Sequence, residues 1–416
     1  MKKIIYHFKK KSTFNFLFVI ICSLYTINFI SAQTLDDYIQ IAKQNNSAIK
    51  EKIYDFELAK EKTNEVGLYE NTRFALGVFA STPETRVGSQ SFNVGVSQKI
   101  PWIGALKAEK DLAKEKVVNK KIDISLSEKD LVYQVKVLYY NLYQKQAVQE
   151  VLRTQKQVLK IYEEMANHAM ANDLSTMSEV LDIHIQNNEL HSKTFQIYTE
   201  IEALSKNFNR LLERDVKTIL NIPTSLNVLD ILIGNPKTEA HPLMENIKQL
   251  NSIYDAENTL IDKYNAPQIS IGVDYILVNK RNDVNINENG KDIWMPKVIL
   301  EVPISKAKKK AQKRQIEIKK DKLFYTLKNQ KRELEIAMET AIFNFHNALV
   351  QVVAAQKNTK ETQRIIDLYI NDYQVGTLKY TKILKLQLKK IQYQLMEIEA
   401  IKNAFMAKSE VEYLSE

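Results

Sequence analysis

Side chains that could do chemistry are few in this sequence, and none of their spacings completes a site. His184 and His191 lie seven residues apart and would share one face of a helix, but no cysteine or acidic partner completes a zinc ligand set with them. Asp283–Gly290 faintly resembles a calcium loop, but its glycine and closing ligand fall at the wrong positions. No phosphate loop, nucleophile elbow or HExxH motif occurs. The sequence therefore predicts no enzyme, and neither a metal nor a cofactor site.

The N-terminal segment has the composition of a secretory signal. Five lysines lie within the first 11 residues, an almost wholly apolar stretch runs from Phe14 to Ile30, and Ser31–Gln33 is typical of a cleavage site. The single cysteine, Cys22, lies inside the apolar stretch, and Ile21 before it argues against a lipid anchor. We expect cleavage after Ala32, which leaves a chain without thiols. A retained transmembrane anchor is the alternative.

The charge of the chain does not indicate a nucleic-acid partner. Without the signal lysines, the formal net charge falls from +9 to about +4, and the remaining basic residues are spread evenly. After the signal, no apolar run approaches the about 20 residues that a transmembrane helix needs. The sequence thus predicts an exported protein that is not an inner-membrane protein and binds no nucleic acid.

One pattern occurs twice, and each copy has two short alternating strands that lead through a proline into a very long helical stretch. The prolines are Pro101 and Pro303. The strands are expected at about 73–80, 91–100, 268–278 and 297–302. We divide the chain into a signal peptide (1–32), a first structural repeat (33–235) and a second (236–416). The sequence therefore predicts a duplicated, mainly α protein with a small β part.

The helical stretches are too long for the core of one globular domain. A helix from Leu106 to Ala171 would span roughly 100 Å at about 1.5 Å per residue. Apolar residues in the helical stretches of both copies recur at spacings of four and three, as in Ile197, Ile201, Leu204, Phe208 and Leu211, which is the narrow seam of a coiled coil. The clearest row is Leu334, Met338, Ala341, Phe345, Ala348, Val352 and Ala355. Such rods have to fold back as helical hairpins.

The turns of these hairpins are expected where helix-ending and helix-capping residues gather. Asparagine and glycine tolerate the left-handed conformation that ends a helix, and aspartate, serine and threonine cap the next one. The first turn is placed at Asn172, Asp173 and Ser175, and the second at Tyr373, Gly376 and Thr377.

The strands alternate between an apolar and a small or polar face, which two kinds of sheet share. One is a transmembrane barrel with lipid outside and water inside, and the other is a half-buried soluble sheet. Two aromatic pairs, Trp102 with Trp294 and Tyr69 with Tyr264, flank the strands as an aromatic girdle would. Four strands cannot close a barrel, which needs about eight. If the strands span a membrane, several copies of the chain share one barrel.

The order of these features resembles the TolC family of outer membrane efflux proteins. The similar parts are an opening helix, a strand-to-helix join, the start of the second repeat and the second hairpin turn. They correspond to Thr34–Asn46, Ser97–Gly104, His241–Met244, and Tyr373–Gly376 followed by Ile383 and Leu384. In the join, Pro101, Trp102 and Gly104 lead from strand to helix, and Pro303 is their counterpart in the second copy.

The resemblance implies a homotrimer whose chains form a twelve-stranded barrel in the outer membrane, continued by a periplasmic α-helical barrel. It implies a passive exit duct of a tripartite efflux or type I secretion system, surrounded by outer-membrane lipid. The implied partners are a periplasmic adaptor (membrane fusion) protein, docked at the hairpin turns, and an inner-membrane pump of the RND or ABC type. Neither the pump class nor the cargo follows from the sequence. A secreted periplasmic coiled-coil scaffold or binding protein with a soluble sheet is the alternative.

The resemblance also suggests which residues line the closed periplasmic end. Drug-efflux members carry acidic rings shortly after the turn glycine, where this chain has Lys382 and Lys385, and the corresponding places in the first copy are Glu179 and Asp182. Our hypothesis is that the two lysines line the constriction and disfavour cations, unless the two acids pair with them. Ordinary helix surface charges are the alternative.

Overall fold

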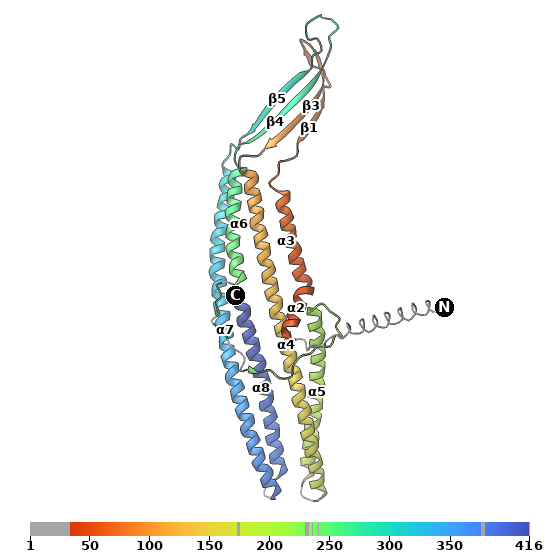
Figure 1. The fold of residues 1–416 in the computed structure, drawn as a ribbon, viewed down its shortest axis with the longest axis vertical. Coiled ribbons are helices and arrows are strands. Elements are labelled where there is room, and N and C mark those ends of the chain that lie inside the picture. Colours follow the sequence, from red (N-terminus) through yellow and green to blue (C-terminus); the bar gives the residue numbers. More distant parts are fainter. Residues whose placement is uncertain are drawn as a thin grey trace, which may run out of the picture. The chain divides into compact units, whose positions relative to one another are not determined.

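The computed structural model describes residues 34–172, 175–228, 233–234, 236–239, 241–283, 285–375 and 379–415. The expected signal peptide with Cys22, and the turn residues Asp173, Gly376 and Thr377, lie outside this described part. The elements in chain order are α2 (Leu35–Asn45), α3 (Ser47–Glu65), β1 (Arg73–Val78), β2 (Glu84–Thr85), β3 (Gly88–Ile100), α4 (Ala105–Ala171), α5 (Met177–Leu211), α6 (Pro242–Tyr264), β4 (Gln268–Asn279), β5 (Ile293–Glu301), α7 (Ala307–Gln374) and α8 (Tyr380–Leu414) (Figure 1). No helix in the described ranges is both long and apolar enough to cross a bilayer.

The chain forms two compact units, and each unit combines segments of both predicted repeats. The described parts of the first unit lie within Thr34–Asn45, Val135–Leu226 and Ala355–Lys402. The second consists of Asn46–Gln134, Asn227–Ala354 and Asn403–Glu416. The long helices α4, α7 and α8 contribute to both units.

The first unit contains a layer of helices in the order α5, α4, α8, α7 (Figure 1). Lys145 on α4 pairs with Glu200 on α5 at 2.8 Å, and Gln356 on α7 donates to Glu397 on α8 at 2.9 Å. Apolar side chains from all four helices form one buried cluster between them. The short α2 is anchored beside this layer by Tyr38, which is fully buried.

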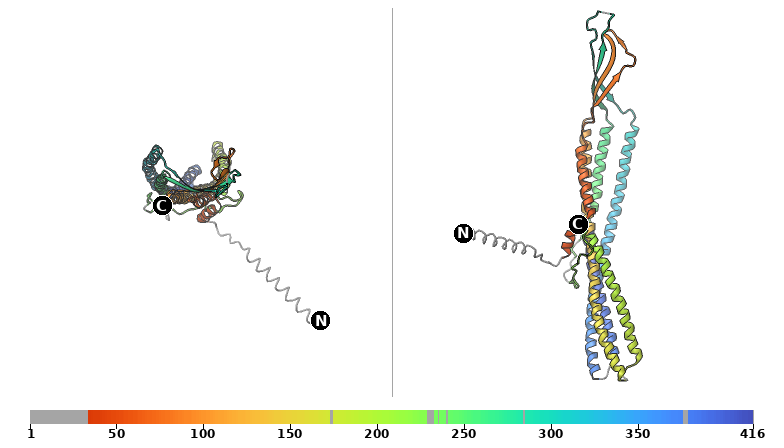
Figure 2. Two further views of the ribbon diagram at one scale, coloured as in Figure 1. Left: turned by 90° about the horizontal axis from the view of Figure 1, so that it is seen from above. Right: turned by 90° about the vertical axis from the view of Figure 1, so that its right-hand side faces the viewer.

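The second unit places the sheet-proximal parts of α4 and α7 beside α3 and α6, in the order α3, α4, α6, α7 (Figures 1 and 2). Lys120 of α4 lies 3.5 Å from Asp55 of α3, and Asn246 of α6 donates to Asp123 of α4 at 3.0 Å. Lys309 of α7 pairs with Asp262 of α6. In both units α7 therefore forms one edge of the helical layer.

The predicted seam of α7 is confirmed, because all seven of its side chains are buried. The small residues of the row allow close helix approach: Ala341 is fully buried, and Ala348 packs with Ala404 and Ala407 of α8.

The opening helix expected at Thr34–Asn46 is followed directly by a second helix. Asn46 separates α2 from α3, and it caps α3 by accepting a hydrogen bond from the Ile49 amide at 3.1 Å.

The strands form one antiparallel sheet in the order β1, β3, β4, β5, with the short β2 paired to β3. The central pair, β3 with β4, joins a strand of each copy, so neither copy has a sheet of its own. β1 and β5 are the two edges. Residues 79 and 80 lie outside β1, although we expected them in that strand, and β3 begins three residues before the expected position 91.

The prediction for the last strand was wrong at its start, because β5 begins at Ile293 and not at Lys297. Pro296 lies inside this strand and cannot donate a backbone hydrogen bond to a sheet ladder. β5 is an edge strand with a ladder partner on one side only, which is where a proline is tolerated. Trp294, expected to flank the strand, therefore lies inside it.

Candidate functional site

The sheet has one face of exposed apolar side chains. Phe74, Leu76 and Val78 on β1 stand opposite Val96, Val94 and Phe92 on β3, and the row continues across Val273 and Ile271 on β4 to Val298 on β5. The side chains on the two edge strands are the most exposed: Leu76 on β1 is 74% exposed, and Val298 on β5 is 72% exposed. Contiguous apolar patches of this kind mark a surface that contacts a partner or a lipid.

The opposite face is mixed, with Ile276, Met295 and Ile299 beside small and polar residues, and it holds an ion pair whose acid is buried. The Asp274 carboxylate lies 2.6 Å from Lys297 Nζ, and its side chain is 8% exposed. Gly95 stands directly opposite Asp274, and a Cβ there would lie 2.5 Å from Asp274 Oδ1. The lack of a side chain at Gly95 therefore makes room for the pair. The predicted alternation of faces is confirmed.

Exposed aromatic residues lie at both ends of the sheet. Trp102, Tyr69 and Tyr264 flank the strands at the helix end, while Trp294 lies at the loop end and packs against Tyr275 with ring centroids 4.9 Å apart. Trp and Tyr prefer the boundary between lipid and water. The apolar face thus lies between these two groups of aromatic residues along the strands.

The strand-to-helix joins use different local devices in the two copies. After Pro101, the Trp102 carbonyl accepts from the Ala105 amide at 2.9 Å, and Gly104 takes a φ of +83°, which a side chain rarely adopts. After Pro303 the join has no glycine, and Ser305 Oγ accepts from the Ala307 amide at 3.4 Å. Each device lets a helix begin within a few residues of the sheet.

The two helical hairpins meet at their turn ends in the first unit. The hydroxyls of Ser175, before α5, and Tyr380, at the start of α8, lie 3.2 Å apart. Ser175 also donates to the Glu179 carboxylate, and the Tyr380 ring stacks on Tyr162 of α4. The Ser175 hydrogen bond, assisted by the charge of Lys379, lowers the pKa of Glu179. Sequence reasoning missed Tyr162, Lys379 and Tyr380, because only the meeting of the hairpins gives them a role.

Of the residues expected at the first turn, Asn172 lies at the end of α4, and Ser175 contacts the other hairpin. Asn172 follows α4, and its side chain donates to the His168 carbonyl at 2.8 Å. Thr176 occupies the N-cap position of α5, so Ser175 is not the cap that we expected. Its hydroxyl is engaged by Glu179 instead. At the second turn Tyr373, 39% exposed, lies in the last turn of α7.

Of the proposed constriction residues, Asp182, Lys382 and Lys385 are exposed on their helices, and Glu179 is half-buried. Lys382 and Lys385 lie on the first turns of α8, and Asp182 accepts from Gln186 at 3.0 Å on α5. Within the described part of the chain, neither lysine forms an ion pair with Glu179 or Asp182. The lysine charges are therefore not neutralised by these acids in a single chain.

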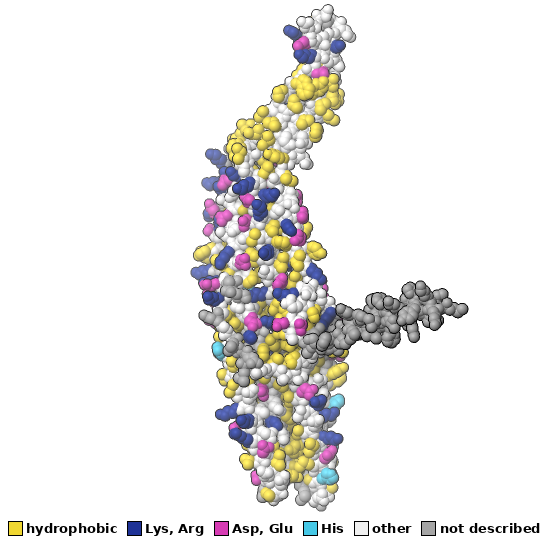
Figure 3. Space-filling model, viewed as in Figure 1, with side chains coloured by type: hydrophobic (Ala, Val, Ile, Leu, Met, Phe, Trp, Pro, Cys, Tyr) yellow, Lys and Arg dark blue, Asp and Glu magenta, His cyan; other side chains and the backbone are white. Residues whose placement is uncertain are grey.

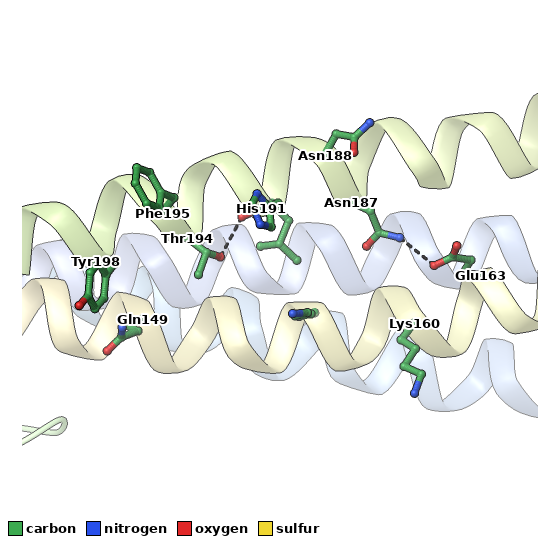
Figure 4. Close-up of a pocket in the computed structure, with 11 residues that line it drawn as sticks. Gln149, Lys160, Glu163, Asn187, Asn188, His191, Thr194, Phe195 and Tyr198 are labelled. Atoms are coloured by element: carbon green, nitrogen blue, oxygen red, sulfur yellow. Dashed lines mark hydrogen bonds between the residues drawn. The ribbon is translucent and has the colours of Figure 1, made fainter.

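A groove of about 760 Å³ lies between α4 and α5 in the first unit (Figure 4). Its lining includes Lys160 and Glu163 from α4, and Asn187, His191, Phe195 and Tyr198 from α5. Asn187 donates to Glu163 at 2.9 Å, and His184 lies 3.3 Å from the same carboxylate. His184 thus has an acidic partner that its own helix does not supply. Across the ranges described, no three His, Cys, Asp or Glu side chains gather as a metal-binding group.

Comparisons with solved structures show which fold the chain has, whereas the comparisons of its sequence found no match. No protein-family model matches the chain, and no curated protein matches it. Among solved structures, the chain is similar to CusC, a channel-forming protein, with a TM-score of 0.76 at 12% identity over 92% of both chains. It is similar to the outer membrane protein VceC of Vibrio cholerae, with a TM-score of 0.71 at 12% identity over 91% of this chain and 95% of VceC. The outer membrane channel MtrE of Neisseria gonorrhoeae, in its open state, has a TM-score of 0.69 at 13% identity, over 91% of this chain and 89% of MtrE. This chain therefore has the fold of the TolC-like outer membrane channels.

Proposed function

We propose that this protein is an outer membrane channel, the passive exit duct of a tripartite efflux or type I secretion system. The observation that carries the proposal is the exposed apolar face of a sheet with two open edges, continuous in the chain with very long helices. A coiled-coil scaffold with a soluble sheet would bury that face. The fold shared with CusC, VceC and MtrE supports the same conclusion.

The open edges of the sheet support a homotrimer. Unpaired backbone groups cost several kcal/mol each in lipid, about the cost of an unsatisfied buried polar group. Pairing β5 of one copy with β1 of the next would satisfy both edges. Three copies, each contributing β1, β3, β4 and β5, would then close one barrel. The edge helices also carry exposed apolar side chains, which suits lateral packing between copies. In the second unit these are Ile53, Tyr54 and Leu58 on α3, and Phe324, Tyr325, Phe343 and Val350 on α7.

The same proposal assigns roles to the hairpin ends and to the groove. A periplasmic adaptor protein would dock at the turn ends near Asn172, Ser175 and Tyr373, and along the groove between α4 and α5. Phe195 is 65% and Tyr198 is 56% exposed there, which leaves apolar area for a partner helix. Lys382 and Lys385 would line the closed end. An inner-membrane pump would supply the energy, because the proposed exit duct is passive.

Membrane fractionation followed by light scattering of the detergent extract tests the proposal. We expect the protein in the outer membrane fraction, released by detergent as a trimer that conducts ions in a planar bilayer. A monomer that stays soluble without detergent would overturn the channel and leave the scaffold interpretation. A membrane-bound oligomer that does not conduct in any state would also contradict an exit duct.

A further inference from the structure

The start of α7 carries a dense cluster of positive charge, immediately after the last strand of the sheet. Residues 305–314 contain six cationic side chains and no acid. The corresponding segment after the other join, residues 105–114, contains three lysines and two acids. The duplication therefore does not explain the cluster, which belongs to the second copy alone. We name these six side chains the α7 basic cluster: Lys306, Lys308, Lys309, Lys310, Lys313 and Arg314.

Half of the α7 basic cluster is already paired within the chain. Asp262 on α6 lies 2.8 Å from both Lys309 and Lys313, and Glu317 lies 2.9 Å from Arg314. The other three, Lys306, Lys308 and Lys310, are exposed and have no acidic partner within 4 Å in the described ranges. Three ammonium groups are thus left for an external anion.

The cluster borders a hollow of about 680 Å³ between the end of α6 and the start of α7. Lys306, Lys310 and Arg314 line it together with Asn265, Pro303 and Glu317, the acidic partner of Arg314. Lys308 is outside this lining, on the exposed surface beside it. Lysine and arginine donors converging on one concave surface suit a phosphate group, which accepts several charge-assisted hydrogen bonds.

The position of the cluster favours a phospholipid as the source of such a phosphate group. The residues just before it are apolar and exposed: Leu300 is 60%, Val302 51% and Ile304 94% exposed. In Figure 3 the Lys and Arg side chains at the sheet-proximal end of α7 gather directly below the hydrophobic side chains of the strands. A soluble anion would contact only the lysines. A phospholipid would place its acyl chains against the apolar residues and its headgroup against the lysines.

We propose that the α7 basic cluster binds the headgroups of anionic phospholipids in the membrane leaflet that faces the helices. The proposal rests on the proposed function, because it needs the apolar sheet face in lipid. Each lysine near an anionic membrane surface favours binding by about fivefold, equivalent to about 1 kcal/mol. Lys306, Lys308 and Lys310 together would give this protein a preference for anionic over zwitterionic lipid of on the order of a hundredfold.

The test uses the full-length protein, released in neutral detergent and mixed with either phosphatidylglycerol or phosphatidylcholine of the same acyl chains. Native mass spectrometry counts the lipids retained on the assembled oligomer. The test variant is Lys306→Gln/Lys308→Gln/Lys310→Gln, and the matched control is Lys328→Gln/Lys357→Gln/Lys360→Gln, three exposed lysines further along the same helix. We expect wild type and control to prefer phosphatidylglycerol, and the test variant to lose at least about tenfold of that preference with its oligomer intact.

Three results would overturn the inference. The test variant could keep the wild-type preference, or it could dissociate into monomers, which would assign the cluster to the interface between copies. Inorganic phosphate could displace phosphatidylglycerol at equal concentration, which would assign the cluster to soluble anions. Failure of the proposed function is distinguishable, because wild type would then form no detergent-dependent conducting oligomer before any lipid is added.

Discussion

The hydroxyl groups of Tyr380 and Ser175 lie 3.2 Å apart, and this contact joins the start of α8 to the segment that precedes α5. Tyr380 is 5% exposed and stacks on Tyr162, so its ring is held independently of the hydroxyl. The contact links the turn ends of two helical hairpins that lie more than 200 residues apart in the sequence. In the proposed channel, separation of these ends would open the periplasmic entrance.

Removal of the Tyr380 hydroxyl is expected to loosen the entrance without unfolding it. Tyr380→Phe keeps the stacked ring and removes the hydroxyl that contacts Ser175 and Glu179, a loss of about 1 kcal/mol or more. We expect the ratio of open to closed channels in planar bilayers to rise by roughly fivefold. Tyr369→Phe, in the same buried cluster and without a hydroxyl contact in the described structure, is the control and should conduct like wild type. Equal open probabilities for Tyr380→Phe and wild type would contradict this role.

Reversal of the charges at Lys382 and Lys385 is expected to reverse ion selectivity. If these exposed lysines form a ring at the constriction, they disfavour cations, and glutamates in the same places would favour them. The reversal potential under a salt gradient measures this directly for Lys382→Glu/Lys385→Glu. Lys357→Glu/Lys360→Glu changes the charge by the same amount on α7. A selectivity that both variants change equally, or that neither changes, would make Lys382 and Lys385 ordinary surface charges.

The pH dependence of the entrance should follow Glu179. Its pKa is lowered from the usual 4.5, chiefly by the Ser175 hydrogen bond. A lowered pKa in the closed state means that the ionised carboxylate stabilises this state above pH 4.5, and that the stabilisation is lost as the pH falls through the lowered pKa. We expect acid opening below pH 4.5 in wild type, and at higher pH, nearer 4.5, in Ser175→Ala. Ser178→Ala, which removes a hydroxyl bonded to Thr176 and not to Glu179, should titrate like wild type. Coincident acid midpoints for Ser175→Ala and wild type would argue against the Ser175–Glu179 contact.

The two faces of β5 should respond oppositely to a new charge. Val298 lies on the apolar face and is 72% exposed, while Met295 lies on the face of Asp274 and is 44% exposed. A lysine facing lipid costs about 2–4 kcal/mol at the membrane centre. Val298→Lys should therefore reduce the yield of membrane-inserted oligomer, and Met295→Lys should not. Native gels of membrane extracts measure both, and equal yields would indicate that the apolar face does not contact lipid.

Features that depend on neighbouring residues in the chain were predictable from the sequence. The buried row from Leu334 to Ala355 follows from spacings of four and three, and the two sheet faces follow from alternation, since the side-chain period of each element is a property of its backbone. Proline and glycine marked the joins for the same local reason. The first four residues of β5, Ile293–Pro296, lay outside the predicted strand, and the place of β5 at the sheet edge is what makes that proline tolerable.

The features on which the proposed function rests join residues far apart in the chain, and only the tertiary structure decided them. The pairing of β3 with β4, the approach of Glu163 to His184 and the contact of Tyr380 with Ser175 each join segments whose separation no local period encodes. The same holds for the α7 basic cluster, because sequence shows six charges but not which of them Asp262 and Glu317 neutralise. The sequence by itself determined the lengths and faces of the helices and strands. Packing decided which faces meet and which stay exposed, since burial depends on what lies opposite a side chain in space.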